Sequence, residues 1–155
     1  MNSTPSLTFM EAVKKCFANY ANFKGRARRS EFWWFWLFSC IVNSIFSMPL
    51  NFLINKKQGL IDAYNAGKMT LSQVDAQDPT TMIRILMVLA GIVALALLLP
   101  SLAAMARRLH DVGKSGAMIL LYLVCGIGGL IPFCMCIPDG NPAPNQYGPS
   151  PKYVQ

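Results

Sequence analysis

A short polar stretch between two long apolar runs carries the side chains that are best suited to chemistry. The stretch "MARRLHDVGKSGAM" (Met105–Met118) holds two arginines, the only histidine, an aspartate and a lysine. His110 next to Asp111 has the residue types of a general acid–base pair, but the chain has no second histidine and no convincing nucleophile stands nearby. We therefore expect no catalytic residue and a protein that is not an enzyme.

The same stretch resembles the end of a phosphate-binding loop at Gly113, Lys114 and Ser115. That motif begins with another glycine five residues before Gly113, where this chain has Arg108. It also requires a preceding strand. Helix chemistry explains the stretch better, because basic side chains favour the negative end of a helix dipole and glycine favours the left-handed turn that ends a helix. We predict a helix end followed by a turn at Gly113, with no bound cofactor.

The composition indicates that membrane helices position this stretch. Apolar residues make up 54% of the chain, charged residues only 14%, and the mean hydropathy is +0.37, whereas soluble domains are roughly one-quarter charged. The net charge of +7 would suit nucleic acid, but the basic residues lie beside the apolar runs rather than on a soluble face. We therefore expect anionic lipid headgroups as partners and no nucleic acid.

Three apolar runs are long enough to cross a bilayer, which takes about 20 residues in a helix. They cover about 32–54, 85–106 and 117–137. The third run contains Gly126, Gly128, Gly129 and Pro132, so it could instead bend back as a re-entrant hairpin covered by protein. The fold class that we predict is all-α, a polytopic helical membrane protein with a single membrane domain over residues 1–155.

The distribution of lysine and arginine predicts the orientation. Six basic residues precede the first run, and Arg107, Arg108 and Lys114 lie between the second and third runs. By the positive-inside rule both segments should be cytoplasmic, which places the N-terminus in the cytoplasm and the polar loop 55–84 outside. The side of the Pro-rich tail 138–155 depends on whether the third run crosses.

Two basic segments should therefore meet on one side of the bilayer. Glu31 and Asp111 could each pair with arginines of the other segment and form a charge network. Its role could be assembly, headgroup binding or docking of a partner. The candidate functional or headgroup-binding residues are Arg26, Arg28, Arg29, Glu31, Arg107, Arg108, His110, Asp111 and Lys114.

An amphipathic helix is predicted over residues 8–23. Phe9, Val13, Phe17 and Tyr20 recur at spacings of three and four, and Thr8 with Glu11 matches a capping box. This helix could lie on the cytoplasmic membrane surface or pack on the protein's own spans.

Cysteine offers no convincing metal site. Cys134 and Cys136 form a C-x-C pair near the end of the third run, without clustered histidine or further cysteine. We expect no bound metal.

Three segments together resemble a bacterial membrane family called domain of unknown function 805. They are "FKGRARRSEFWWFWLF" (Phe23–Phe38), "ARRLHDVGKSG" (Ala106–Gly116) and "NQYGPSP" (Asn145–Pro151). The resemblance implies a small multi-pass protein of the bacterial inner (plasma) membrane, with no established activity. The chain departs from the family pattern at Ala117 and Met118, where members usually show tryptophan, and the loop after the first run looks longer than usual.

Two functions remain open on the sequence. The first is a non-enzymatic membrane module that binds lipid or protein through the cytoplasmic charge network, either as a homo-oligomer or with another membrane protein. The alternative is a small oligomeric transporter or channel component, which polar residues within the runs such as Asn43 and Ser101 would suit. No run carries an intramembrane carboxylate or base that would mark an ion path.

Overall fold

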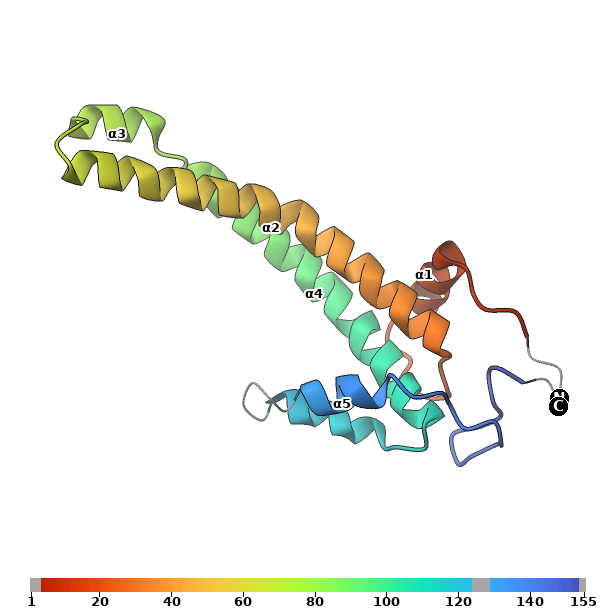
Figure 1. The fold of residues 1–155 in the computed structure, drawn as a ribbon. Helices are drawn as coiled ribbons and strands as arrows, with labels where there is room; N and C mark the ends of the chain where they lie inside the picture. Colours follow the sequence, from red (N-terminus) through yellow and green to blue (C-terminus); the bar gives the residue numbers. More distant parts are fainter. Residues whose placement is uncertain (1–3, 124–128, 154–155) are drawn as a thin grey trace. The chain divides into compact units, whose positions relative to one another are not determined.

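The computed structural model describes residues 4–123 and 129–153, and every regular element among them is a helix. The elements are α1 (Phe9–Ala18), α2 (Arg29–Asn65), α3 (Leu71–Gln77), α4 (Thr80–Asp111), a 3₁₀-helix η1 (Gly116–Leu123) and α5 (Leu130–Met135) (Figure 1). The predicted all-α class is confirmed, since no strand occurs in these described ranges.

Helices α2 and α4 are long and apolar enough to cross a membrane. They contain 37 and 32 residues, and at a rise of 1.5 Å per residue each exceeds the roughly 30 Å of a hydrocarbon core. Helix α2 continues to Asn65 and α4 begins at Thr80, so part of the segment predicted as a polar loop, 55–84, is helical and also contains α3. Hydropathy predicts which residues enter the hydrocarbon, whereas a helix continues until its backbone turns, here near Gly67 with φ of 68°.

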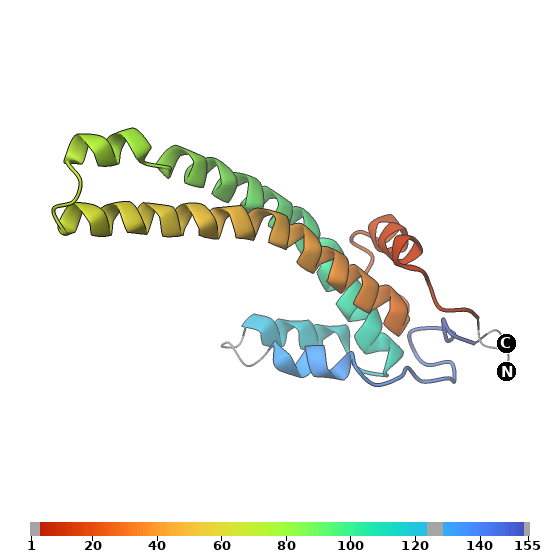
Figure 2. The ribbon, with the colours of Figure 1, turned by 45° about the horizontal axis from the view of Figure 1, so that its top comes forward.

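The third apolar run does not form a single spanning helix in the part of the chain that the structure describes. Elements η1 and α5 contain only 8 and 6 residues, and each is too short to cross a bilayer. They lie side by side in Figures 1 and 2, which is the arrangement of the hairpin alternative. Two of the glycines invoked for the bend, Gly126 and Gly128, lie outside the described residues.

The chain divides into two compact units. We call residues 1–39 and 97–155 the network unit and residues 40–96 the apolar unit. In the apolar unit large side chains such as Ile45, Phe52 and Leu95 are exposed, and only Leu60 is buried. Lys57 of α2 contacts the connection between α3 and α4, since its ammonium lies 3.6 Å from the Asp78 carboxylate beside the start of α4.

Helix α1 begins with the predicted capping box and packs on the protein. The Thr8 backbone N–H donates to the Glu11 carboxylate at 2.9 Å, which confirms the box. The side chain of Asn19 donates to the Lys15 carbonyl at 2.9 Å and closes the last turn, so the helix ends at Ala18 and not at residue 23 as predicted.

The buried face of α1 contacts the beginning of α2. Ala12, Val13 and Cys16 are buried, and the ring of Phe17 meets the ring of Phe35 edge to face with centroids 5.6 Å apart. These contacts agree with the alternative in which the amphipathic helix packs on the protein's own helices. Its placement at a membrane surface stays a prediction.

Candidate functional site: a buried ion-pair network and a basic cavity

In the network unit, backbone and side-chain contacts join the end of α4 to the segment before α2. The Ala27 N–H donates to the Arg107 carbonyl at 2.9 Å, and both predicted acids pair with arginines of the other segment. Gly113 has a φ of 76°, so the predicted turn after α4 adopts the left-handed conformation that glycine favours.

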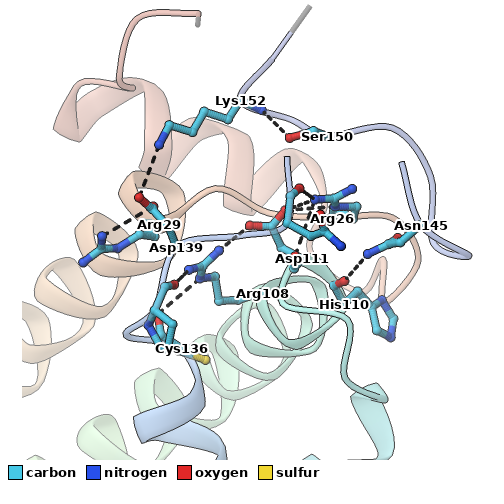
Figure 3. A network of polar contacts seen from close by, with 12 residues as sticks. Arg26, Arg29, Arg108, His110, Asp111, Cys136, Asp139, Asn145, Ser150 and Lys152 are labelled. Atoms are coloured by element: carbon cyan, nitrogen blue, oxygen red, sulfur yellow. Dashed lines mark hydrogen bonds and ion pairs between the residues drawn. The ribbon is translucent and has the colours of Figure 1, made fainter. Parts of the chain in front are cut away.

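Asp111 is the centre of the larger group of ion pairs (Figure 3). One carboxylate oxygen lies 2.9 Å from Nη2 of Arg26, and the other accepts from Nη1 of Arg108. All three residues are buried, and the side chain of Arg108 is fully so. A buried charge is costly unless it is paired and hydrogen-bonded, so these pairs must form together.

Backbone carbonyls of the tail satisfy the remaining donors of the two arginines. Arg26 donates to the carbonyls of Ala143 at 2.9 Å and Gly148 at 3.2 Å, and also to that of Asn141. Arg108 donates to the carbonyls of Cys136 at 3.2 Å and of Pro138. The arginines therefore hold the tail in place and have few donors left for a ligand.

Glu31 is the centre of the second group. Nη1 of Arg107 lies 2.5 Å from Oε1 of Glu31, and the ammonium of Lys15 lies 2.9 Å from Oε2. The Lys15 ammonium does not meet the geometry of a hydrogen bond to Glu31 Oε2. Nη2 of the buried Arg107 has no hydrogen-bond partner among the described residues. Cys16 is buried beside this group, and burial raises the pKa of its thiol to about 12, so the thiol is neutral.

The tail packs on His110 and Asp111 rather than lying free. The rings of His110 and Tyr147 stack with centroids 3.8 Å apart and planes 6° apart, and Nδ1 of His110 lies 3.0 Å from the Gly25 carbonyl. A Cβ atom at Gly140 would overlap the Asp111 carboxylate, so only glycine permits this approach. Sequence analysis missed these tail residues, although the motif "NQYGPSP" was a signal for Tyr147.

The structure divides the predicted site residues into a buried and an accessible group. The buried ones are Arg26, Glu31, Arg107, Arg108 and Asp111, and His110 is half-buried beside them. Arg28, Arg29 and Lys114 lie outside this buried network. Arg28 donates to the Thr4 hydroxyl at 2.7 Å, whereas Lys114 is exposed.

A cavity of about 310 Å³ opens beside the buried network in the network unit. It brings together basic and acidic side chains, three serines and a glycine from the N-terminal segment, the start of α2, the end of α4 and the tail. Its lining residues are Ser6, Arg28, Arg29, Ser30, Arg108, Asp111, Asp139, Gly140, Ser150 and Lys152. Four cations face two carboxylates, so the cavity is basic.

Asp139 bridges two of these cations. Its Oδ1 lies 3.4 Å from Nη1 of Arg29, and its Oδ2 lies 3.3 Å from Nζ of Lys152. The hydrogen bond from Lys152 holds the pKa of Asp139 below its usual range, and contacts with Tyr153 and Asp139 raise the pKa of Lys152. The Asp139 carboxyl and the Lys152 amine are therefore both charged at neutral pH. Sequence analysis singled out neither Asp139 nor Lys152.

The structure brings together no set of residues for metal binding within residues 4–123 and 129–153. No group of three or more His, Cys, Asp or Glu side chains there could hold a metal ion. Cys134 is exposed whereas Cys136 is buried. The two sulfurs of the C-x-C pair therefore lie in different environments.

Proteins similar to this chain over most of its length are named as inner membrane proteins. The Escherichia coli (strain K12) inner membrane protein YhaH is 34% identical over 143 residues, which cover 92% of this chain and 98% of that protein. The inner membrane protein YhaI of the same strain is 34% identical over 135 residues, covering 87% of this chain and 90% of that protein.

No solved structure shows a significant match to this chain. The model of the family described as "Protein of unknown function (DUF805)" matches residues 20–149, which include Arg26, Arg29, the basic segment after α4 and most of the tail. The resemblance seen in the sequence is confirmed. The chain belongs to the DUF805 family and is a membrane protein whose relatives reside in the bacterial inner membrane.

Proposed function

We propose that this protein is a non-enzymatic membrane module that binds anionic groups at the cytoplasmic surface of the inner membrane. The observation that carries the proposal is the basic cavity, in which accessible cations lie beside buried ion pairs. Arg29 and Lys152 are about half-exposed, at 46% and 36% of their side-chain surface. They can therefore reach a ligand without breaking the buried pairs.

The proposed topology places this cavity at the level of the lipid headgroups. Helices α2 and α4 cross the bilayer, η1 and α5 are the two arms of a re-entrant hairpin, and both termini are cytoplasmic. Basic residues before α2 and after α4 support this orientation by the positive-inside rule. Each basic side chain near an anionic leaflet contributes about 1 kcal/mol of attraction, so anionic lipids should gather near the cavity.

The buried network serves as the scaffold in this proposal. Arg26, Arg107 and Arg108 are at most 8% exposed, and their carboxylate partners are intramolecular. An arginine whose donors are already used cannot bind a headgroup without losing those bonds. Arg28 likewise donates to Thr4 and Pro5. The headgroup should therefore be bound by Arg29 and Lys152.

The test is thermal stabilisation of the purified full chain in a neutral detergent by short-chain phosphatidylglycerol, compared with phosphatidylcholine. We expect stabilisation by phosphatidylglycerol that is strongly reduced in the double variant Arg29→Gln/Lys152→Gln. The control is Lys14→Gln/Lys24→Gln, which removes the same charge from exposed positions outside the cavity. Equal responses to both lipids, or equal losses in both double variants, would contradict the proposal.

A further inference from the structure

Asp139 is held in the basic cavity much more loosely than Asp111. Its carboxylate lies 3.3 Å and 3.4 Å from its two cations, and its side chain is 58% exposed, whereas the side chain of Asp111 is 6% exposed. Exposed pairs of this kind contribute little to stability, because solvent screens the charges. The contact with Arg29 and Lys152 can therefore be exchanged at little cost.

The backbone on both sides of Asp139 is fixed by the buried network. The Pro138 carbonyl accepts a hydrogen bond from Arg108, and Gly140 packs against the carboxylate of Asp111. The Asn141 N–H donates to the Asp111 carbonyl at 2.9 Å. A rotation of the Asp139 side chain alone can thus vacate the space between the two cations, with the tail still in place (Figure 3).

The groups that Asp139 would leave behind suit a phosphate. Arginine and lysine are the usual phosphate-binding cations. The hydroxyls of Ser30 and Ser150 accept from the N–H groups of Leu7 at 3.3 Å and Lys152 at 3.4 Å. In these described contacts the serine oxygens are acceptors, which leaves their O–H protons to donate to an anion. A phosphate has more acceptor oxygens than a carboxylate and can engage more of these donors.

We infer that the cavity is a phosphate site and that the Asp139 carboxylate is its resting occupant, which a phosphate group displaces from Arg29 and Lys152. The inference rests on the proposed function and names the ligand chemistry of the same cavity. The phosphate can belong to a lipid headgroup or be free inorganic phosphate, since both present non-bridging phosphate oxygens that accept hydrogen bonds.

The inference predicts that phosphate binds more tightly when the negative charge of Asp139 is removed. Asp139→Asn removes the competing carboxylate and keeps the size of the side chain. Because two exposed ion pairs are lost from the ligand-free state and each tenfold change in affinity corresponds to about 1.4 kcal/mol, we expect phosphate affinity to rise about three- to tenfold.

The experiment titrates the full chain in neutral detergent with inorganic phosphate and, separately, with short-chain phosphatidylglycerol, at constant ionic strength. The affinity is obtained from the rise of the unfolding midpoint with ligand concentration. The matched control is Glu11→Gln, which removes one negative charge from an exposed residue outside the cavity and retains a side chain able to close the capping box.

Tighter binding by Asp139→Asn and unchanged binding by Glu11→Gln would support the inference. The ligand that shows the gain distinguishes a lipid headgroup from free phosphate. Unchanged or weaker binding by Asp139→Asn would overturn the inference, while wild-type binding of phosphatidylglycerol would leave the proposed function standing. Absence of phosphatidylglycerol and phosphate binding in every variant would overturn both.

Discussion

The two units of this chain differ in what they expose and bury. The apolar unit exposes large apolar side chains, whereas the network unit buries charged side chains. In the apolar unit, side chains such as Ile45, Met48 and Phe52 are 62–72% exposed, whereas the network unit buries Glu31, Arg108 and other charged residues. An exposed apolar surface of this extent is stable when lipid is the solvent, because lipid tails are as apolar as the side chains. Buried charges, by contrast, need partners supplied by the protein.

This difference shows which unit depends on tertiary contacts. The helices of the apolar unit satisfy their backbone hydrogen bonds within each segment, so their stability is largely local. The network unit depends on contacts between residues far apart in the chain, such as Arg26 with Asp111 and Thr4 with Lys152. Substitutions at the network should therefore destabilise the protein far more than matched substitutions in the apolar unit.

The largest effect is expected when Asp111 loses its charge. Asp111→Asn leaves Arg26 and Arg108 buried without their carboxylate, and breaking a buried ion pair from one side costs about 3–5 kcal/mol. Thermal or denaturant unfolding in detergent measures the loss. The control in the apolar unit is Asp62→Asn, an exposed residue that accepts from Gln58 at 3.0 Å, for which we expect a change within about 0.5 kcal/mol. Similar losses in both variants would remove the contrast between the units.

Two glycine substitutions should change stability with opposite signs. Gly140→Ala places a Cβ atom on the Asp111 carboxylate and should destabilise the protein by about 1–3 kcal/mol, as overpacking does. Gly59→Ala lies within α2, where a Cβ atom meets no atom within 4 Å, and should stabilise the helix by up to about 1 kcal/mol. The same unfolding measurement serves both. A neutral or stabilising effect of Gly140→Ala would show that the tail does not pack on Asp111.

The aromatic stack on the tail should give a smaller effect. Tyr147→Leu removes the ring that stacks on His110, and aromatic pairs contribute about 0.5–1.5 kcal/mol beyond their buried area. Tyr64→Leu, at an exposed position of the apolar unit, is the matched control. If both leucine variants unfold at the same midpoint, the stack contributes nothing to the position of the tail.

The smallest effect concerns pH and Asp139. The pKa of Asp139 is lowered in the folded state by the hydrogen bond from Lys152, so its contribution to stability is present above the unfolded pKa and is lost as pH falls through the lower folded value. The difference in unfolding midpoint between the wild type and Asp139→Asn should therefore be constant between about pH 5 and pH 8. A difference that changes within this range would mean that Asp139 is not held as a carboxylate by Arg29 and Lys152.

Sequence alone predicted the features that depend on local pattern. The apolar runs predicted the central parts of α2 and α4, and the spacing of Thr8 and Glu11 predicted the start of α1. Composition near the helix ends also indicated that Glu31 and Asp111 would pair across the two basic segments. Hydropathy could not give the ends of α2 and α4, because polar residues continue a helix beyond the hydrocarbon.

The accessible part of the site could not be predicted in the same way. Asp139 and Lys152 join Arg29 only because the tail folds back on the end of α4, and no periodicity links positions more than a hundred residues apart. The need for glycine at position 140 likewise arises from a contact with Asp111 and leaves no pattern of its own. The regular spacing of hydrophobic residues in a helix carries no information about such a tail.

The most direct test of headgroup binding is native mass spectrometry of the full chain released from detergent after incubation with an equal mixture of phosphatidylglycerol and phosphatidylcholine. We expect the wild type and Lys14→Gln/Lys24→Gln to retain phosphatidylglycerol selectively, and Arg29→Gln/Lys152→Gln to lose that selectivity. Retention of both lipids in equal amounts by the wild type, or undiminished selectivity in Arg29→Gln/Lys152→Gln, would contradict binding of anionic headgroups in the basic cavity.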